Sequence, residues 1–142
     1  MNPTVGAFFG WVIVISYILT IMNYVMKAAN KKWGKTIRKN EKLKGPWQAV
    51  LTFVVKNHKL FGVIAALGII VHFFIQYNRW GFVTSGAIAA GLMFLQAGLG
   101  GYGYRMKKSR KGLWLNIHRV VAVLLFFAIA YHLIYVYQNY NF

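Results

Sequence analysis

The chain has 142 residues, of which 58% are hydrophobic and 13% are charged, and its mean hydropathy is +0.48. This composition excludes an ordinary soluble domain and is typical of membrane proteins. The chain contains no cysteine, which excludes disulfides, iron–sulfur ligation and thiolate chemistry. Its net charge is +16, and Glu41 is its only acidic residue.

Four segments of the chain are predicted to cross a membrane as helices. A hydrocarbon core of about 30 Å needs roughly 20 mostly apolar residues in a helix. The segments are long and lack the alternating pattern of strands, so helices are expected. The predicted fold is all-α, a transmembrane up-down four-helix bundle that forms one domain. The four spans are expected at about residues 5–26, 49–77, 81–104 and 113–137.

The basic residues lie almost entirely on one side of the predicted membrane. Loop 27–48 carries eight Lys and Arg residues, loop 105–112 carries five, and three more lie at the same boundary. Only Arg79 lies at the opposite boundary, so 16 of 17 cations share one face. The positive-inside rule then places both loops in the cytoplasm and both termini outside a plasma membrane. The loops would contact anionic lipid headgroups or, alternatively, an acidic redox protein, and no nucleic-acid partner is expected.

The four histidines form two pairs with the same spacing. His58 and His72 are 14 residues apart in the second span, and His118 and His132 are 14 apart in the fourth. Fourteen residues turn a helix by about 1400°, roughly 40° short of four full turns, and rise by about 21 Å. Both histidines of a span therefore share one face. Their line includes small and apolar residues: Gly62, Ala65 and Ile69 in one span, and Ala122, Leu125 and Ile129 in the other.

The topology predicts which histidines meet. The second and fourth spans run in the same direction, and such helices lie diagonally across an up-down bundle. His58 and His118 are then expected at the cytoplasmic level, and His72 and His132 at the outer level. Two imidazoles at each level are the axial ligands of a haem iron. Zinc fits less well because no carboxylate or thiolate completes a tetrahedron, and a proton relay lacks acidic residues in the spans.

Other residues at these levels are candidates for contact with the two haems. Gly62 leaves space beside the cytoplasmic level, and Gly86 and Gly100 of the third span are themselves 14 residues apart. The two glycines would admit a porphyrin edge or, alternatively, serve close helix packing. The haem propionates favour cations. The cationic residues nearest to the two levels come directly after the cytoplasmic-side histidines in the sequence or lie beside the outer level. These cations, which could instead extend to lipid headgroups, are Lys59, Arg119 and Arg79.

With its paired histidine motif, HKLFGVIAALGIIVH in one span and HRVVAVLLFFAIAYH in another, the chain resembles the di-haem membrane cytochrome b superfamily. The resemblance covers roughly residues 5–137. It implies two non-covalent haem b groups, the first held by His58 and His118 and the second by His72 and His132. It also implies glycines at the haem levels, which Gly86 and Gly100 match. The first span has no clean pair of this kind.

The expected function is transmembrane electron transfer. The resemblance implies a cytochrome b subunit of a respiratory, quinone-linked complex, with other redox subunits or electron carriers as partners and quinone as an additional candidate ligand. The alternatives are a stand-alone reductase of ferric iron or another small acceptor, and a quinol dehydrogenase. A structural membrane subunit without a cofactor is the remaining alternative, and it predicts no haem absorbance.

Overall fold

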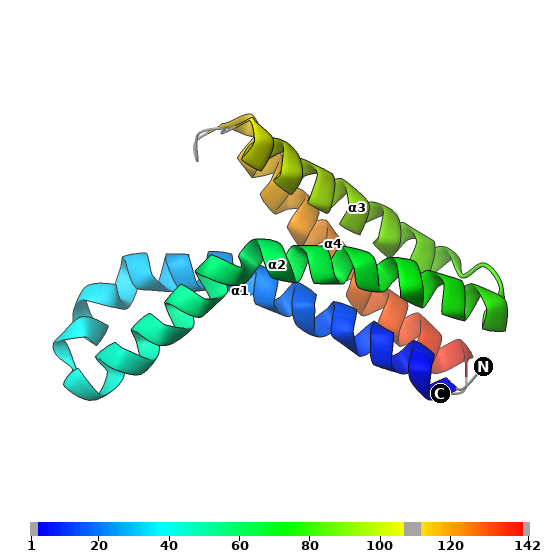
Figure 1. Ribbon diagram of the computed structural model, residues 1–142, viewed down its shortest axis with the longest axis horizontal. Helices are drawn as coiled ribbons and strands as arrows, with labels where there is room; N and C mark the ends of the chain where they lie inside the picture. The colour runs from blue at the N-terminus through cyan, green and yellow to red at the C-terminus, as the bar shows by residue number, and fades with distance from the viewer. Residues whose placement is uncertain (1–2, 107–111, 141–142) are drawn as a thin grey trace.

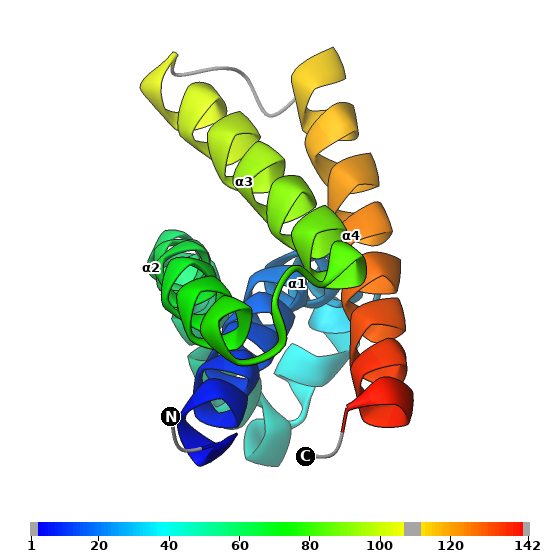
Figure 2. The ribbon, with the colours of Figure 1, turned by 90° about the vertical axis from the view of Figure 1, so that its right-hand side faces the viewer.

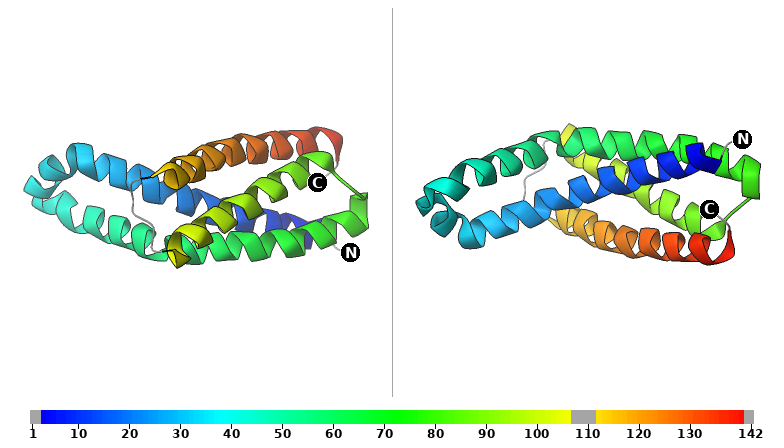
Figure 3. Two further views of the ribbon diagram at one scale, coloured as in Figure 1. Left: turned by 90° about the horizontal axis from the view of Figure 1, so that it is seen from above. Right: turned by 90° about the horizontal axis from the view of Figure 1, so that it is seen from below.

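The computed structural model describes residues 3–106 and 112–140 and contains four helices in these ranges. They are α1 (Pro3–Lys39), α2 (Glu41–Trp80), α3 (Thr84–Arg105) and α4 (Leu113–Asn139). Consecutive helices run in opposite directions, as the colour progression in Figure 1 shows. Both termini and the connection between α2 and α3 lie at one end (Figure 3). The all-helical fold and its up-down course are as predicted.

Three of the helices are long and apolar enough to cross a membrane: α1, α2 and α4. Helix α3 has 22 residues, about 33 Å by the α-helical rise, but it falls short in apolarity. Its six glycines, Ser85 and Gln96 account for this shortfall. Large apolar side chains cover the outside of the helices, among them Phe8, Leu67 and Phe127, each 60% exposed or more. A surface of this kind is stable against lipid and aggregates in water.

The segment predicted as loop 27–48 is helical except for Asn40. The prediction of a loop was wrong because it used the charge of this segment, whereas its lysines, alanines and arginine are good helix formers. Asn40 has extended backbone angles and interrupts the two helices. Its side-chain Oδ1 accepts a hydrogen bond of 3.0 Å from the backbone N–H of Lys42, which caps α2. The first two helices therefore continue as an antiparallel pair well beyond α3 and α4 (Figures 1 and 3).

Helix α2 ends where the chain requires a left-handed residue. Gly81 has φ 74° and donates its N–H to the carbonyl of Tyr77 at 2.9 Å. This is the common way in which a glycine closes a helix. The third helix begins three residues later at Thr84, not at residue 81 as the sequence predicts. The short connection keeps α2 and α3 adjacent at the end that also holds the termini (Figure 2).

The helices pack as two hairpins. Helix α1 lies along α2 and α3 along α4, whereas contacts between the hairpins are sparse. Figure 2 shows the two hairpins diverging toward the end where α3 meets α4. Specific contacts cross between them: the Tyr17 hydroxyl donates to the Ala122 carbonyl at 2.5 Å, and the rings of Trp80 and Tyr140 lie 4.7 Å apart. The hairpins are therefore joined at particular points along their length.

A single apolar layer lies at mid-height in the bundle. Its buried members come from all four helices: Ile13, Tyr17, Ala65, Ile69, Met93 and Leu125. Ala65 and Leu125 are 1% and 0% exposed, and both belong to the predicted histidine faces of α2 and α4. The prediction that these faces point inward is confirmed here. The layer lies between the two histidine levels along each helix.

Replacing Leu125 by alanine is expected to destabilise the bundle by about 2 kcal/mol, because it leaves a cavity in the one layer that all four helices share. Thermal unfolding in detergent measures this loss. The matched control is Leu124→Ala, since the neighbouring side chain is 52% exposed and should leave stability nearly unchanged. Equal effects of the two variants would contradict the assigned core.

Candidate functional site

The structure brings the histidines of α2 and α4 together at the end that holds the termini. The rings of His72 and His132 have centroids 6.5 Å apart, and their planes are nearly perpendicular, at 88°. We call them the termini-side pair. The sequence predicts this pairing from spacing and topology alone, and the structure confirms it.

Each ring of the termini-side pair is oriented by a contact from a neighbouring helix. His72 Nδ1 donates to the carbonyl of Gly6 in α1 at 3.0 Å. His132 Nδ1 shares a hydrogen bond of 3.0 Å with the hydroxyl of Ser85, a buried residue of α3. A histidine that binds a metal through one nitrogen commonly fixes its ring through the other. With Nδ1 engaged in both rings, Nε2 is the nitrogen that can bind a ligand.

His58 and His118 belong to the opposite level, toward the end where α1 and α2 extend beyond α3 and α4 (Figure 1). We call them the arm-side pair, and they are held differently. The Nε2 of His118 lies 3.2 Å from the side-chain nitrogen of Gln96. His58 lies near the backbone of Thr20 in α1 and near His118 in α4. The Nδ1 atoms of both rings are buried without a hydrogen-bond partner. This ring arrangement is the reverse of that in the termini-side pair.

Buried polar atoms without a partner come from all four helices. They are Asn23 Oδ1 in α1, His58 Nδ1 in α2, Gln96 Oε1 in α3 and His118 Nδ1 in α4, with Gln76 Oε1 and Arg79 NH1 farther along α2. Leaving a buried polar group unpaired costs about 1–3 kcal/mol. Such a concentration needs an explanation, and a bound group with its own polar atoms supplies one.

The predicted glycines lie directly against the histidines. A Cβ at Gly86 would be 3.0 Å from Cε1 of His132, and one at Gly100 would be 3.5 Å from Cε1 of His118. A Cβ at Gly10 would be 3.3 Å from Cε1 of His72. A Cβ at Gly62 would meet no atom within 4 Å. Gly10, Gly86 and Gly100 thus make room for an imidazole against a helix backbone, and Gly62 borders open space.

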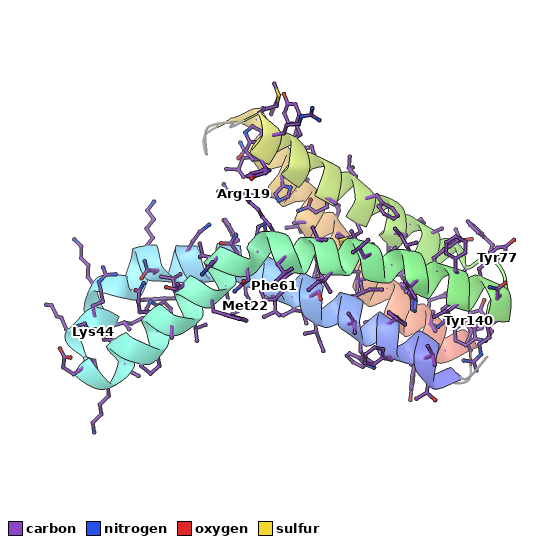
Figure 4. The ribbon with its side chains drawn as sticks, viewed as in Figure 1. Met22, Lys44, Phe61, Tyr77, Arg119 and Tyr140 are labelled. Carbon is purple, nitrogen blue, oxygen red and sulfur yellow. The ribbon has the colours of Figure 1, made fainter. Side chains whose placement is uncertain are left out.

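The three predicted cations each lie over an aromatic ring. Lys59 Nζ is 3.5 Å from the ring centroid of Tyr104, and the Arg119 guanidinium is 5.1 Å from that of Tyr24. Both of these contacts connect one hairpin to the other. Arg79 lies 4.6 Å from the ring of its neighbour Trp80, and its NH1 is among the buried atoms without a partner. Figure 4 labels Arg119 near the start of α4.

Within residues 3–106 and 112–140, no group of three or more His, Cys, Asp or Glu side chains could hold a metal ion. Each level therefore offers a pair of imidazoles. A tetrahedral zinc site needs four ligands, whereas axial ligation of a planar macrocycle needs two.

Sequence reasoning did not single out Asn23, Ser85 or Gln96 as site residues. A signal for them exists, because each is a polar residue within a predicted apolar span, and such residues are costly unless they are used. Identifying their partners required the helix packing, since each contacts or approaches a histidine level from a different helix.

Comparisons with protein-family models, curated proteins and solved structures find no match to this chain.

Proposed function

We propose that the chain is a transmembrane electron carrier that holds two haem b groups, one between each histidine pair, in the manner of the di-haem cytochromes b. When bound, haem supplies an iron that accepts and releases single electrons. The protein supplies four axial imidazoles, their orientation and the surrounding charge. The two levels are about 21 Å apart along each helix, and the macrocycles shorten the distance between their edges.

The termini-side pair carries this proposal. Two nitrogens that bind one metal ion from opposite sides lie about 4 Å apart, because each bond is about 2 Å. Adding the distance from each nitrogen to its ring centre gives ring centroids roughly 6 Å apart. The observed 6.5 Å agrees with this separation, and Nδ1 is anchored in both rings. The NH1 atom of Arg79 is a buried donor without a hydrogen-bond partner, and it suits a haem propionate.

The proposed orientation follows the charge. We place four spans in a plasma membrane, including the less apolar α3, with the basic connections in the cytoplasm and both termini outside. The arm-side pair then lies near the cytoplasm. Electrons pass between a cytoplasmic donor or a quinone and an acceptor on the far side, with the chain serving as the cytochrome b subunit of a larger redox complex.

A redox difference spectrum with haem quantification tests the proposal. We expect a b-type α-band on reduction, two haems per chain, and complete extraction of haem into acidified acetone, because no cysteine can hold it covalently. A purified chain without a Soret band would overturn the proposal in favour of a structural subunit. Rapid, saturable reduction of ferric chelates by the isolated chain would instead assign a self-sufficient reductase.

Replacing Gln96 by leucine is expected to speed haem uptake at the arm-side level. The glutamine amide occupies the Nε2 atom of His118 that iron needs, and releasing one such hydrogen bond costs about 1 kcal/mol, or roughly fivefold in rate. Stopped-flow mixing of the haem-free chain with haemin measures this rate, and a His72→Ala background isolates the arm-side level. Slower uptake would show that Gln96 supports ligation instead of competing with it.

A further inference from the structure

The paired helical extension of α1 and α2, residues 27–57, forms a basic arm that no other helix covers. Figure 1 shows the arm projecting past the end of α3 and α4, and Figure 4 labels Lys44 at its tip. Its two helices are joined by the Trp47 indole N–H, which donates to Asn30 Oδ1 at 3.1 Å. Arg38 reaches the same oxygen at 3.4 Å. Met26 and Val54 are buried near its base, so the arm is an ordered extension of the bundle.

The arm concentrates the positive charge of the molecule. Its nine cations are all exposed: Lys27, Lys31, Lys32, Lys35, Arg38, Lys39, Lys42, Lys44 and Lys56. Glu41 is the only acid of the chain and lies 3.9 Å from Lys44 with its side chain 85% exposed. The arm therefore carries nine positive charges and one negative charge, a net +8. Mutual repulsion of these charges is relieved when an anionic partner binds.

The arm cannot lie within the hydrocarbon. Residues 45–55 of α2 carry no charge and are mostly apolar, but they run beside the basic part of α1, as the Trp47–Asn30 bond shows. Burying that part would place several lysines in lipid at a cost of about 3 kcal/mol each. The membrane boundary is therefore placed near Lys56, where the charged residues of both helices begin.

The tip of the arm extends beyond the lipid headgroups. Fourteen residues separate Lys42 from Lys56, which is about 21 Å of helix. The headgroup layer on one side is only about 5–8 Å thick, and charge interactions decay over roughly 8 Å of saline. Because the arm continues outward and does not fold back along α3 and α4, its tip is beyond effective attraction to lipid (Figure 3).

The surface of the arm combines charge with apolar area. Leu43 is 53% exposed between Lys42 and Lys44, and Trp33 is 51% exposed in the basic part of α1. A groove along α2 has a lysine at each end and is lined by Lys44, Gly45, Gln48, Ala49, Thr52, Phe53, Lys56 and Asn57. Apolar contacts within a charged rim are typical of protein-docking sites.

We propose that the basic arm is the docking site for an acidic soluble electron-carrier protein in the cytoplasm. The carrier lies along the arm, with its carboxylates against the lysines and its redox centre over the arm-side pair at the base of the arm. The role of this partner as electron donor or acceptor rests on the proposed function. The binding itself rests on the charge, reach and exposure of the arm.

Binding of a small acidic flavodoxin to the full chain in phosphatidylcholine nanodiscs tests this proposal. We expect affinity to fall about tenfold or more between roughly 0.02 M and 0.3 M salt. The triple variant Lys35→Glu, Lys39→Glu and Lys42→Glu should bind flavodoxin at least tenfold more weakly than the native chain at low salt. The matched control replaces the same three residues by arginine and should bind as the native chain does. Equal affinity of the glutamate and native chains would overturn the proposal.

A second measurement distinguishes protein from lipid as the occupant of the arm. Leu43→Cys introduces the only thiol of the chain, and a spin label there reports its surroundings. We expect the spin label to remain accessible to an aqueous nickel chelate even in bilayers rich in phosphatidylglycerol. A label that becomes buried in such bilayers would instead assign the arm to the membrane surface.

These measurements also separate the two proposals. Neither the binding nor the spin-label measurement requires haem, so both can be made on haem-free protein. Absence of haem from the purified chain would overturn the electron-transfer function without deciding whether the arm docks an acidic protein.

Discussion

Replacing His72 by alanine is expected to remove the haem proposed at the termini-side pair and to leave the haem proposed at the arm-side pair in place. The lost imidazole is one of two rings whose centroids are 6.5 Å apart, and the remaining ring, His132, cannot hold the group alone. We expect the haem content to fall to half, with one set of redox-dependent absorbance changes retained. Pyridine haemochrome quantification per chain measures the loss. An unchanged haem content would refute the ligand assignment.

A structural role for His72 is separated from ligation by a control and by chemical rescue. Gln76→Ala removes a buried polar side chain one turn farther along α2, beside Gly6, without removing an imidazole, and should retain both haems. Imidazole added to the His72→Ala protein should restore the missing absorbance, because the small ligand can enter the space left by the side chain. A merely structural histidine would show no such restoration.

Introducing a side chain at Gly86 is expected to cause the same loss without replacing any of the proposed histidine ligands. In a Gly86→Val variant, Cβ would lie 3.0 Å from Cε1 of His132, and the valine methyl groups extend farther toward the ring. The imidazole must move, because the helix backbone cannot retreat without disturbing its own hydrogen bonds. We expect loss of the termini-side haem, retention of the arm-side haem, and unchanged helical content by circular dichroism.

Helix α3 also provides the matched control for this variant. A Cβ at Gly91 meets no atom within 4 Å, so Gly91→Val adds the same side chain to the same helix in open space. Valine is a better helix former than glycine, and this variant should keep both haems. Equal haem loss in both variants would mean that Gly86 acts through the helix and not through the ring of His132.

The positions of the histidines could be predicted because helix geometry is periodic. A spacing of 14 residues places two side chains on one face of a helix whatever surrounds them. The distribution of basic residues predicts the direction in which each helix crosses the membrane. This reasoning correctly identified the inward faces that contain Ala65 and Leu125 and the meeting of His72 with His132. It also placed Gly86 and Gly100 at the histidine levels, where both approach a ring.

Other features depend on packing that no single segment encodes. Gln96 reaches His118 from a different helix, and Lys59 and Arg119 each lie over an aromatic ring of the other hairpin. Residues 27–48 of the arm were predicted as a loop and residues 49–57 as part of the second span. Hydropathy separates lipid-facing from water-facing residues, whereas helix propensity is nearly independent of charge. The most apolar part of helix α3 is less apolar than that of the other three helices, since the small residues that help helices approach one another contribute little hydropathy.

The buried apolar layer at mid-height determines which kinds of charge can cross the bundle. Leu125 and Ala65 leave almost no accessible surface in this layer. Electrons can tunnel through such a layer, whereas protons need a chain of hydrogen-bonding groups. Under the proposed function, each electron that crosses this layer moves net charge against or along the membrane potential, at about 2.3 kcal/mol for every 100 mV.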